Sequence, residues 1–491
     1  MSNISRRSFV GAAAAIPFSV WFEKNASAQA VKVRHSAYSL QGKSMLVTYR
    51  KAVDKMMNQI PAGDPTWWVF QWYTHAVKQP PGKTAELNSI YPSPSPNKTL
   101  ATEVWSTCQA HFNPANENFF LPWHRMFVFF FERIIRKVSG SASFTLPYWN
   151  YSAAGVNHGK IPPEFRVAGS PLLITKRNVH TATNSFANVN AGQAIDQFSP
   201  GILSLSSLAQ CTYKPVGTTI QGFNLALDQG LHGNVHVFVG NGQNMGAVPW
   251  AAGDPVFWMH HSNIDRLWAS WNKAGRKNPT TDPTWMNKQF VFADENGHRI
   301  VATVKDFVSI SQLGYTYDAF EPVPACPPAP LSAAAEKVQA VAPSISLSSG
   351  AAQTTLAPSG AAADSIPARV KALKPGHHIY LVIRDLKADA QPEAAYNVYL
   401  DMPPDTPPAK RRAYYVGTIH FFDAVAHEGH EESAPTAENP GKFYSFDITQ
   451  VAKSLVAQKK LKATPAVTII PAGEPAAEAR PVVGDIKLIE K

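Results

Sequence analysis

Cysteine is scarce in this 491-residue chain, which contains only Cys108, Cys211 and Cys326. At most one disulfide can form within it, so stability must come from hydrophobic cores. Dense runs of Lys or Arg are also missing, although the formal charge is +10. Because nucleic-acid binding depends on clustered positive charge, the sequence argues against nucleic acid as a partner.

The length and composition predict several folded units. A chain of 491 residues is too long for one ordinary hydrophobic core, so two or three units are expected. The hydrophobic share of 45% and the charged share of 16% are typical of soluble globular proteins. The 40 prolines indicate many loops or a linker.

The N-terminus has the pattern of an export signal. Ser5-Arg6-Arg7-Ser8-Phe9-Val10 is a twin-arginine motif, and the apolar stretch 11–22 follows it. Ala28-Gln29-Ala30 then matches a signal-peptidase site, and the apolar run is too short to span a membrane. We therefore expect residues 1–30 to be a twin-arginine signal peptide. The mature chain would be periplasmic or extracellular, without stable membrane association.

The remaining chain divides by composition into three segments. Residues 31–322 are rich in aromatic residues with helical periodicity, as in 126–138, and predict a mainly α domain. Residues 323–367 are dominated by Pro, Ala and Ser, which predicts a linker. Residues 368–491 contain short β-rich runs separated by turn residues and predict a small antiparallel β-sandwich. These runs are 379–383, 396–400, 414–422, 442–448 and 466–470.

Two groups of histidines stand in contexts that suit a metal site. His232 and His236 are four residues apart and would share one helix face, although two surface histidines would show the same spacing. His260 and His261 lie in the aromatic-rich segment 254–268, where burial is costly unless a metal compensates.

Three more histidines precede these along the chain. His124 opens an apolar helix in Phe119-Phe120-Leu121-Pro122-Trp123-His124-Arg125, with His111 and His75 upstream. Three of the upstream histidines and three of the downstream ones could together hold two metal ions. Imidazole ligands without thiolate or carboxylate favour copper over calcium, magnesium or structural zinc.

The motifs F-x-L-P-W-H-R, H-x-x-x-H and D-P-V-F-x-x-H-H-x-x-x-D-R occur here in the order typical of type-3 dicopper proteins. The chain resembles the tyrosinase and catechol oxidase (polyphenol oxidase) family over residues 40–318, ending at the tyrosine motif 315–317, and its C-terminal part resembles that of plant polyphenol oxidases more loosely. The resemblance implies a four-helix bundle holding two coppers. It assigns the first copper to His75, His111 and His124, and the second to His232, His236 and His261. His260 would be a neighbour hydrogen-bonded within the core.

The resemblance also assigns roles around the metals. Phe257 matches an aromatic wedge near the coppers, and Asp265 would either orient nearby groups or pair with an arginine. Asp228 and Gly233 stand where efficient monophenolases tend to have Glu and Asn, which hold a proton-accepting water. We therefore expect diphenol oxidation to exceed monophenol hydroxylation. Val248 is small where plant enzymes often carry Phe, so the way to the metals should be open.

The region around His111 departs from the family pattern. Twelve residues separate His111 from His124, more than is usual, which indicates an insertion at 112–118. Cys108 could form a thioether with His111 or remain a buried free thiol. A further motif, residues 427–432, could bind metal, but a polar hairpin loop is the favoured explanation.

The predicted function is oxidation of ortho-diphenols to ortho-quinones by O2 with two coppers, and weaker monophenol hydroxylation. Alternatives are a true tyrosinase, a hemocyanin-like O2-binding protein, or a copper-binding protein without catalysis. Laccases are disfavoured because neither H-x-H pairs nor a His-Cys-His run occurs. A further hypothesis from the resemblance is that the C-terminal domain shields the site until a protease cuts the linker.

Overall fold

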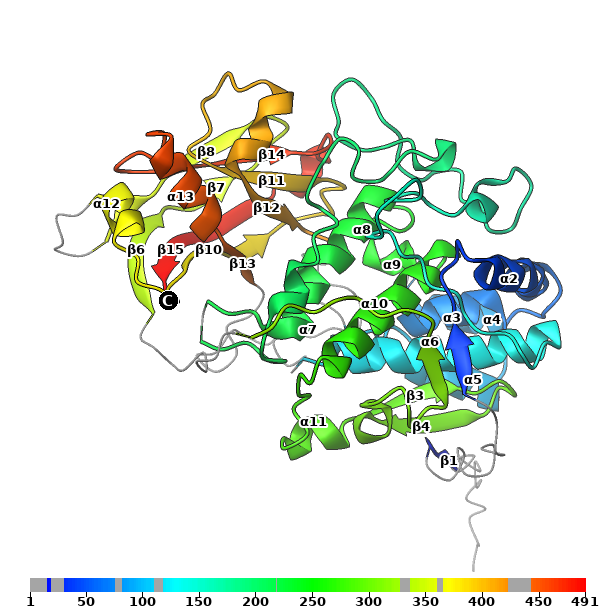
Figure 1. Ribbon diagram of the computed structural model, residues 1–491. Helices are drawn as coiled ribbons and strands as arrows, with labels where there is room; N and C mark the ends of the chain where they lie inside the picture. Colours follow the sequence, from blue (N-terminus) through cyan, green and yellow to red (C-terminus); the bar gives the residue numbers. More distant parts are fainter. Residues whose placement is uncertain are drawn as a thin grey trace, which may run out of the picture.

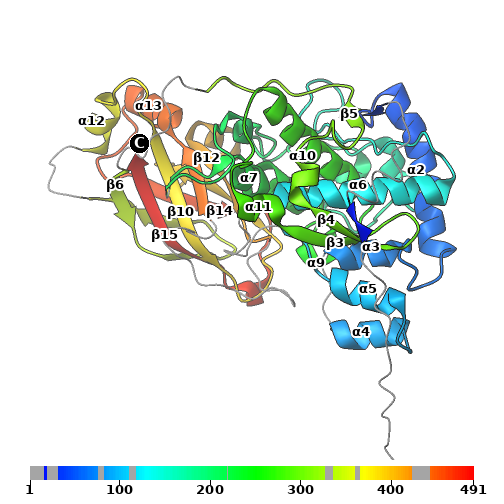
Figure 2. The same ribbon diagram turned by 90° about the horizontal axis from the view of Figure 1, so that it is seen from below.

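The computed structural model describes residues 16–18, 31–75, 82–109, 118–217, 219–326, 336–359, 365–422 and 443–491. A mainly helical part is followed by a part made of antiparallel strands, and the two lie side by side (Figure 1). In the view from below, the sheets lie to the left and the helices α2 and α6 to the right (Figure 2). The predicted order, helical first and β-rich second, is confirmed.

Helices α2, α6 and α10 are the longest of the helical part, and both α2 and α10 pack against α6. Helix α6 begins after Phe119 and ends at Gly140, whose φ of 70° is the left-handed conformation that glycine adopts readily. The predicted helical segment 126–138 lies within it. The helices are α2 (Leu40–Asn58), α3 (Trp68–His75), α4 (Lys83–Ile90), α5 (Pro96–Val104), α6 (Phe120–Ser139), α7 (Gly222–Leu227), α8 (Gly233–Val239), α9 (Val248–Ala251), α10 (Val256–Lys273) and α11 (Pro283–Asn287).

Short strands and turns complete the helical part. Strand β2 (Lys32–Arg34) pairs in parallel with β5 (Tyr315–Tyr317), which brings the two ends of this part together. A small sheet has the order β1-β4-β3, from β1 (Ile16–Pro17), β3 (Gln289–Ala293) and β4 (Arg299–Thr303). The short helical turns are η2 (Pro163–Arg166), η3 (Val189–Ala191), η4 (Ser206–Ala209), the π-helical η5 (Asp228–His232) and η6 (Val304–Phe307).

Two antiparallel sheets form the C-terminal part. The larger has the order β13-β10-β15-β6-β9, with β7 also paired to β15, and the smaller has the order β12-β11-β14-β8. Side chains of both sheets, such as Ile383 and Val398, belong to one buried cluster. The elements are β6 (Lys337–Ala342), β7 (Ile345–Ser346), β8 (Ala352–Thr355), β9 (Ala357–Pro358), α12 (Ile366–Lys371), β10 (Ile379–Lys387), β11 (Ala395–Leu400), η7 (Pro408–Tyr414), β12 (Tyr415–His420), β13 (Phe443–Asp447), α13 (Thr449–Ala457), β14 (Ala466–Pro471), η8 (Ala477–Ala479) and β15 (Val482–Glu490).

The prediction of a linker at 323–367 is wrong over residues 337–358 and from Ile366 onward. Strands β6 to β9 lie within 337–358, and Ile366 already belongs to α12. Strand β6 pairs with β15 from Lys337 to Ala342, and Leu356 is completely buried. Alternating small apolar residues are enough to form strands when a neighbouring strand supplies the hydrogen bonds.

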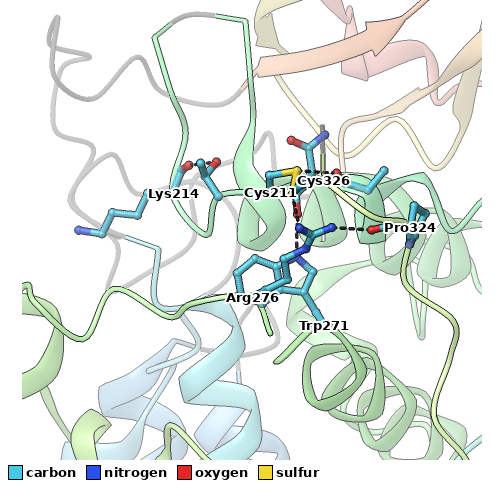
Figure 3. Close-up of a disulfide and its surroundings, with 9 residues drawn as sticks. Cys211, Lys214, Trp271, Arg276, Pro324 and Cys326 are labelled. Carbon is cyan, nitrogen blue, oxygen red and sulfur yellow. Dashed lines mark hydrogen bonds between the residues drawn. A yellow bond between two sulfur atoms is a disulfide. The ribbon is translucent and has the colours of Figure 1, made fainter. Parts of the chain in front are cut away.

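One disulfide joins Cys211 to Cys326, while Cys108 is buried and takes no part in a disulfide. The one disulfide that three cysteines allow is therefore present. Arg276 donates to the carbonyl of Pro324 at 2.5 Å and also contacts the Cys326 sulfur (Figure 3). The end of the helical part is thereby fixed to the loop that holds Cys211.

No helix in the described part of the chain is both long and apolar enough to cross a membrane.

Candidate metal centre

Helix ends and turns place the predicted ligands. His75 is the last residue of α3, and His124 lies in the first turns of α6, just after Pro122. His232 closes the π-helical turn η5, and His236 follows one turn later in α8. His260 and His261 lie in the middle of the buried helix α10. Four helical segments therefore converge on one site.

The histidines form two adjoining buried groups. In the first group, one ligand atom each from His75, Cys108 and His124 lies within 4.8 Å of the others. The second group contains His232, His236, His260 and His261 under the same limit. The rings of His124 and His261 stack with their centroids 4.3 Å apart. The two predicted metal positions are therefore neighbours across α6 and α10.

Hydrogen bonds at Nδ1 fix which nitrogen each ligand offers. Nδ1 of His124 lies 2.8 Å from the carbonyl of Phe120, and Nδ1 of His236 lies 2.8 Å from that of Met245. A carbonyl only accepts, so these nitrogens carry the proton, and each Nε2 keeps its lone pair for a metal. The Nε2 atoms of His236 and His261 accordingly face each other at 3.4 Å.

The electrostatics of the second group suit a metal ion. Burial holds the pKa of His236, His260 and His261 well below the usual value, and neighbouring imidazoles lower it further. Neutral imidazole is the form that binds a metal. Nδ1 of His261 is buried with no hydrogen-bond partner among the described residues. A converging set of neutral nitrogen donors, with no carboxylate in either group, fits copper.

The surroundings of the first group are described only in part. His111 lies outside the described residues, so its assignment as a ligand stays a prediction. The predicted partner of Cys108 was His111, whereas its sulfur lies 3.6 Å from Nε2 of His124. Cys108 thus faces the metal side of a predicted ligand. Residues 427–432, the other histidine motif, also lie outside the described part.

The expectation that His260 is hydrogen-bonded within the core is wrong for the described residues. Neither of its ring nitrogens has a partner there, although the residue is completely buried. Its ring instead stacks on His232, with centroids 5.3 Å apart and planes 13° from parallel. Ring packing rather than hydrogen bonding fixes His260.

Phe257 lies between the two groups, as expected of an aromatic wedge. Its ring centroid is 4.1 Å from that of His261 and 4.8 Å from that of His75, and the side chain is completely buried. Val248 begins α9 and is buried, and its predicted effect on substrate access stays a prediction.

Asp228 contacts a predicted ligand directly. Its carboxylate Oδ1 and its own carbonyl both lie 3.1 Å from Nδ1 of His232. The hydrogen bond of Nδ1 to the Asp228 carbonyl orients the ring, and the negative charge of the nearby carboxylate makes Nε2 a better donor. The sequence assigned Asp228 to a substrate-side water, and the structure adds this contact with the imidazole.

A cluster of buried charges links the two ligand helices. Asp265, four residues after His261, accepts hydrogen bonds from Arg125 at 2.5 Å and Arg34 at 3.1 Å. The hydroxyls of Tyr315 and Tyr317 each donate to it at 2.6 Å. Because Arg125 follows His124 directly, this ion pair ties α6 to α10 beside the metal groups.

The resemblance suggested that the C-terminal domain shields the site, but the residues that make the contact were not predicted. Phe422 stacks on His236, with centroids 4.5 Å apart and planes 27° from parallel, and is 1% exposed. His420 lies against Gly233, where an added Cβ would be within 3.0 Å of three atoms of the His420 ring. No local pattern could have marked either residue, because each contact joins segments almost 190 positions apart.

Comparison with protein families places this centre in a known group. The model of the common central domain of tyrosinase matches residues 65–274, and that of the polyphenol oxidase middle domain matches 279–327. A domain of unknown function matches 334–491, which coincides with the two C-terminal sheets.

Individual relatives agree with this placement. Tyrosinase HcTyr1 of Hahella sp. is 34% identical over 323 residues, covering 61% of this chain but only 66% of that relative. Two plant relatives are matched over 54% and 48% of their length. Latent apple tyrosinase has the same fold, with 20% identity, a TM-score of 0.59 and coverage of 94% and 97% of the two chains. A functional unit of octopus hemocyanin shares it at 16% identity and a TM-score of 0.52, covering 92% and 99%.

Proposed function

The chain belongs to the tyrosinase and polyphenol oxidase family of dicopper enzymes, and on that premise we propose that it uses O2 to oxidise ortho-diphenols to ortho-quinones. Monophenol hydroxylation is the weaker activity. The observation that carries the proposal is the pair of adjoining buried imidazole groups, stacked through His124 and His261. In the overall reaction two diphenols give four electrons and four protons to one O2, leaving two quinones and two waters.

The protein contributes geometry and a dry environment. Copper, when bound, supplies the electron transfer between phenol and O2. The hydrogen bonds of His124 and His236 to backbone carbonyls hold their Nε2 atoms toward the metal positions. Phe257 fills the space between the groups and excludes water from it.

The proposed preference for diphenols depends on the base that would take the proton of a monophenol. A monophenol must lose its proton before hydroxylation, and a base near the second metal group would take it. The carboxylate of Asp228 is instead directed at Nδ1 of His232, and Gly233 provides no side chain to hold a water. A diphenol is more acidic and already carries both oxygens, so it depends less on this base.

Oxygen uptake by the purified, copper-loaded chain tests the proposal. The chain is cut between 327 and 335, and a catechol and the matching monophenol are supplied in parallel. Uptake with catechol and slower uptake with monophenol is expected. Equal or faster uptake with monophenol would make the protein a true tyrosinase. Reversible O2 binding without turnover would make it a hemocyanin-like carrier, a class that shares the fold.

Shielding by the C-terminal part is a second element of the proposal. Phe422 covers the face of His236, so a phenol cannot occupy that face while β12 is docked. A protease acting on 327–335 would free the domain and open the site. Removal of residues 336–491 after cutting should raise catechol turnover, and unchanged turnover would refute the shielding.

Export by the twin-arginine route is proposed from the sequence pattern, in which Arg6 and Arg7 precede an apolar stretch and a signal-peptidase site. Replacement of both by Lys should leave the protein in the cytoplasm of an expressing bacterium, whereas the unaltered chain should reach the periplasm or medium. Equal export of the two forms would contradict this route.

A further inference from the structure

The backbone conformation at position 233 does not require a glycine. Its φ of −63° and ψ of −36° are ordinary helical values, and it opens α8. Alanine is favoured over glycine in such a conformation. The space around it explains the residue, because a Cβ there would lie within 3.0 Å of three atoms of the His420 ring.

A hydrogen bond to a backbone carbonyl holds His420 in this position. The carbonyl is available because the π-helical turn leaves it without a bond to the N–H of Gly233. The N–H of Gly233 bonds to the carbonyls of Asp228 and Gly230 and passes over that of Gln229. Nε2 of His420 lies 2.9 Å from the Gln229 carbonyl and donates to it. Gly233 and the Gln229 carbonyl together form a pocket for one imidazole, which we name the His420 socket.

The His420 ring has little freedom to move away from the socket. The backbone N–H of His420 donates to the hydroxyl of Tyr444 at 3.1 Å, and that hydroxyl lies 3.0 Å from the His420 carbonyl. These bonds fix the end of β12 to β13. Rotation of the His420 ring to make room for a side chain at position 233 would break its hydrogen bond to the Gln229 carbonyl.

The socket also sets the position of Phe422. Phe422 follows His420 by two residues, and its backbone N–H donates to Nδ1 of His420 at 3.4 Å. The ring that covers His236 is therefore placed by the imidazole seated on Gly233. A displacement of His420 would carry Phe422 away from the metal groups.

A second glycine makes a close contact of a different kind. A Cβ at Gly242 would lie within 2.9 Å of three side-chain atoms of Glu393. Glu393 is exposed, and its carboxylate, which accepts from the backbone N–H of Gly242, ends a flexible side chain that can move aside more readily than the buried His420 ring. Gly242 therefore provides a matched control at the same interface.

We propose that the His420 socket is one of the contacts that keep the C-terminal domain closed over the metal centre, and that any side chain at position 233 weakens the closed state without cleavage of the chain. This inference rests on the shielding proposed above. It assigns Gly233 a role in docking of the C-terminal domain. This role is separate from the absence of an Asn side chain at position 233, which the resemblance linked to weak monophenol hydroxylation.

The test uses the full, copper-loaded chain in five forms: unaltered, Gly233→Ala, His420→Ala, the double variant, and Gly242→Ala. Hydrogen–deuterium exchange is measured for peptides covering 233–239 and 415–422. The second readout is the ratio of catechol turnover after cutting to that before cutting. A ratio is unaffected by damage to the metal site that lowers both activities equally.

Gly233→Ala and His420→Ala should each speed exchange in both peptides and reduce the turnover ratio by about tenfold, the effect of a tenfold larger open fraction. The double variant should be no more open than either single variant, because both changes break one contact. Gly242→Ala should stay within about twofold of the unaltered chain.

Unaltered exchange and ratio in both single variants would overturn the proposal, as would equal opening by Gly242→Ala. If the unaltered chain shows no oxidase activity even after cutting, the proposed function fails, and the exchange data still decide whether the socket closes the domain. His420→Ala provides the answer if Gly233→Ala does not fold.

Discussion

Replacement of Asp265 by Asn probes the charge cluster that holds the two ligand helices together. The carboxylate accepts from Arg125, Arg34 and two tyrosine hydroxyls, and it is 3% exposed. After the change, Arg34 keeps Glu132 as an ionic partner at 2.8 Å. Arg125 keeps a hydrogen bond to the carbonyl of Phe307 and its position over the Trp268 ring, but no carboxylate.

The expected loss follows from the uncompensated charge. Removal of one partner from a buried ion pair costs about 3–5 kcal/mol, because the remaining charge stays desolvated. For a folded unit as large as the helical part, this loss of stability corresponds to a fall in melting temperature on the order of 10 °C. The exposed pair of Asp389 and Arg480, 2.6 Å apart, is the control. Asp389→Asn should cost about 1 kcal/mol or less.

The pH dependence adds a second check. Burial alone raises the pKa of Asp265, but the attraction of Arg125 and Arg34 outweighs it and sets the pKa below the usual value. A carboxyl with a lowered pKa contributes stability above its unfolded pKa of about 3.9, and that contribution is lost as pH falls through the folded pKa. The difference between the unaltered chain and Asp265→Asn should therefore be constant from about pH 8 to pH 5 and shrink below about pH 4.

Chemical denaturation of both forms across this pH range is the assay. A loss below about 1 kcal/mol at pH 7, or equal losses for Asp265→Asn and Asp389→Asn, would show that the buried charge cluster does not stabilise the fold as expected.

Three further changes address the site and its surroundings. Phe422→Ala should weaken the closed state by about 2 kcal/mol, roughly thirtyfold, and raise catechol turnover of the uncut chain, whereas unaltered turnover would contradict shielding by this ring. Cys326→Ser removes a disulfide whose cysteines are 115 positions apart, and it should lower the free energy of unfolding by about 2–5 kcal/mol in denaturant titrations. The unaltered chain with its disulfide reduced should lose the same amount, and an unchanged free energy of unfolding would contradict a stabilising role. Asp228→Asn removes the carboxylate at Nδ1 of His232 and should weaken copper binding about 10–100-fold against a competing chelator, and equal affinity would show that the contact does not support the ligand.

The helical segments and the convergence of the predicted ligands could be inferred from the sequence, because the signals are local. His232 and His236 share a helix face through their spacing, and Pro122 and Phe119 mark the start of α6 before His124. Phe257 follows from its position one turn before His261. Each of these residues is placed by its own helix, which neighbouring sequence positions determine.

Contacts between distant segments could not be inferred. Arg34 is fully buried although it is charged, since Glu132 and Asp265 meet it only after the ends of the helical part come together. The contacts of His420 and Phe422 with α8 likewise depend on how the C-terminal sheets dock. The linker prediction failed because the Ala- and Ser-rich composition of 337–358 concealed strands that are stabilised by β15.

Copper titration of the purified full chain measures how many metal ions the two imidazole groups bind. Bound copper is measured by elemental analysis after removal of excess ion, for the unaltered chain and for His236→Ala. We expect two coppers in each unaltered chain and a loss confined to one of them in the variant. Binding of a single copper or none by the unaltered chain, or an unchanged copper content in His236→Ala, would contradict the assignment of two adjoining copper sites.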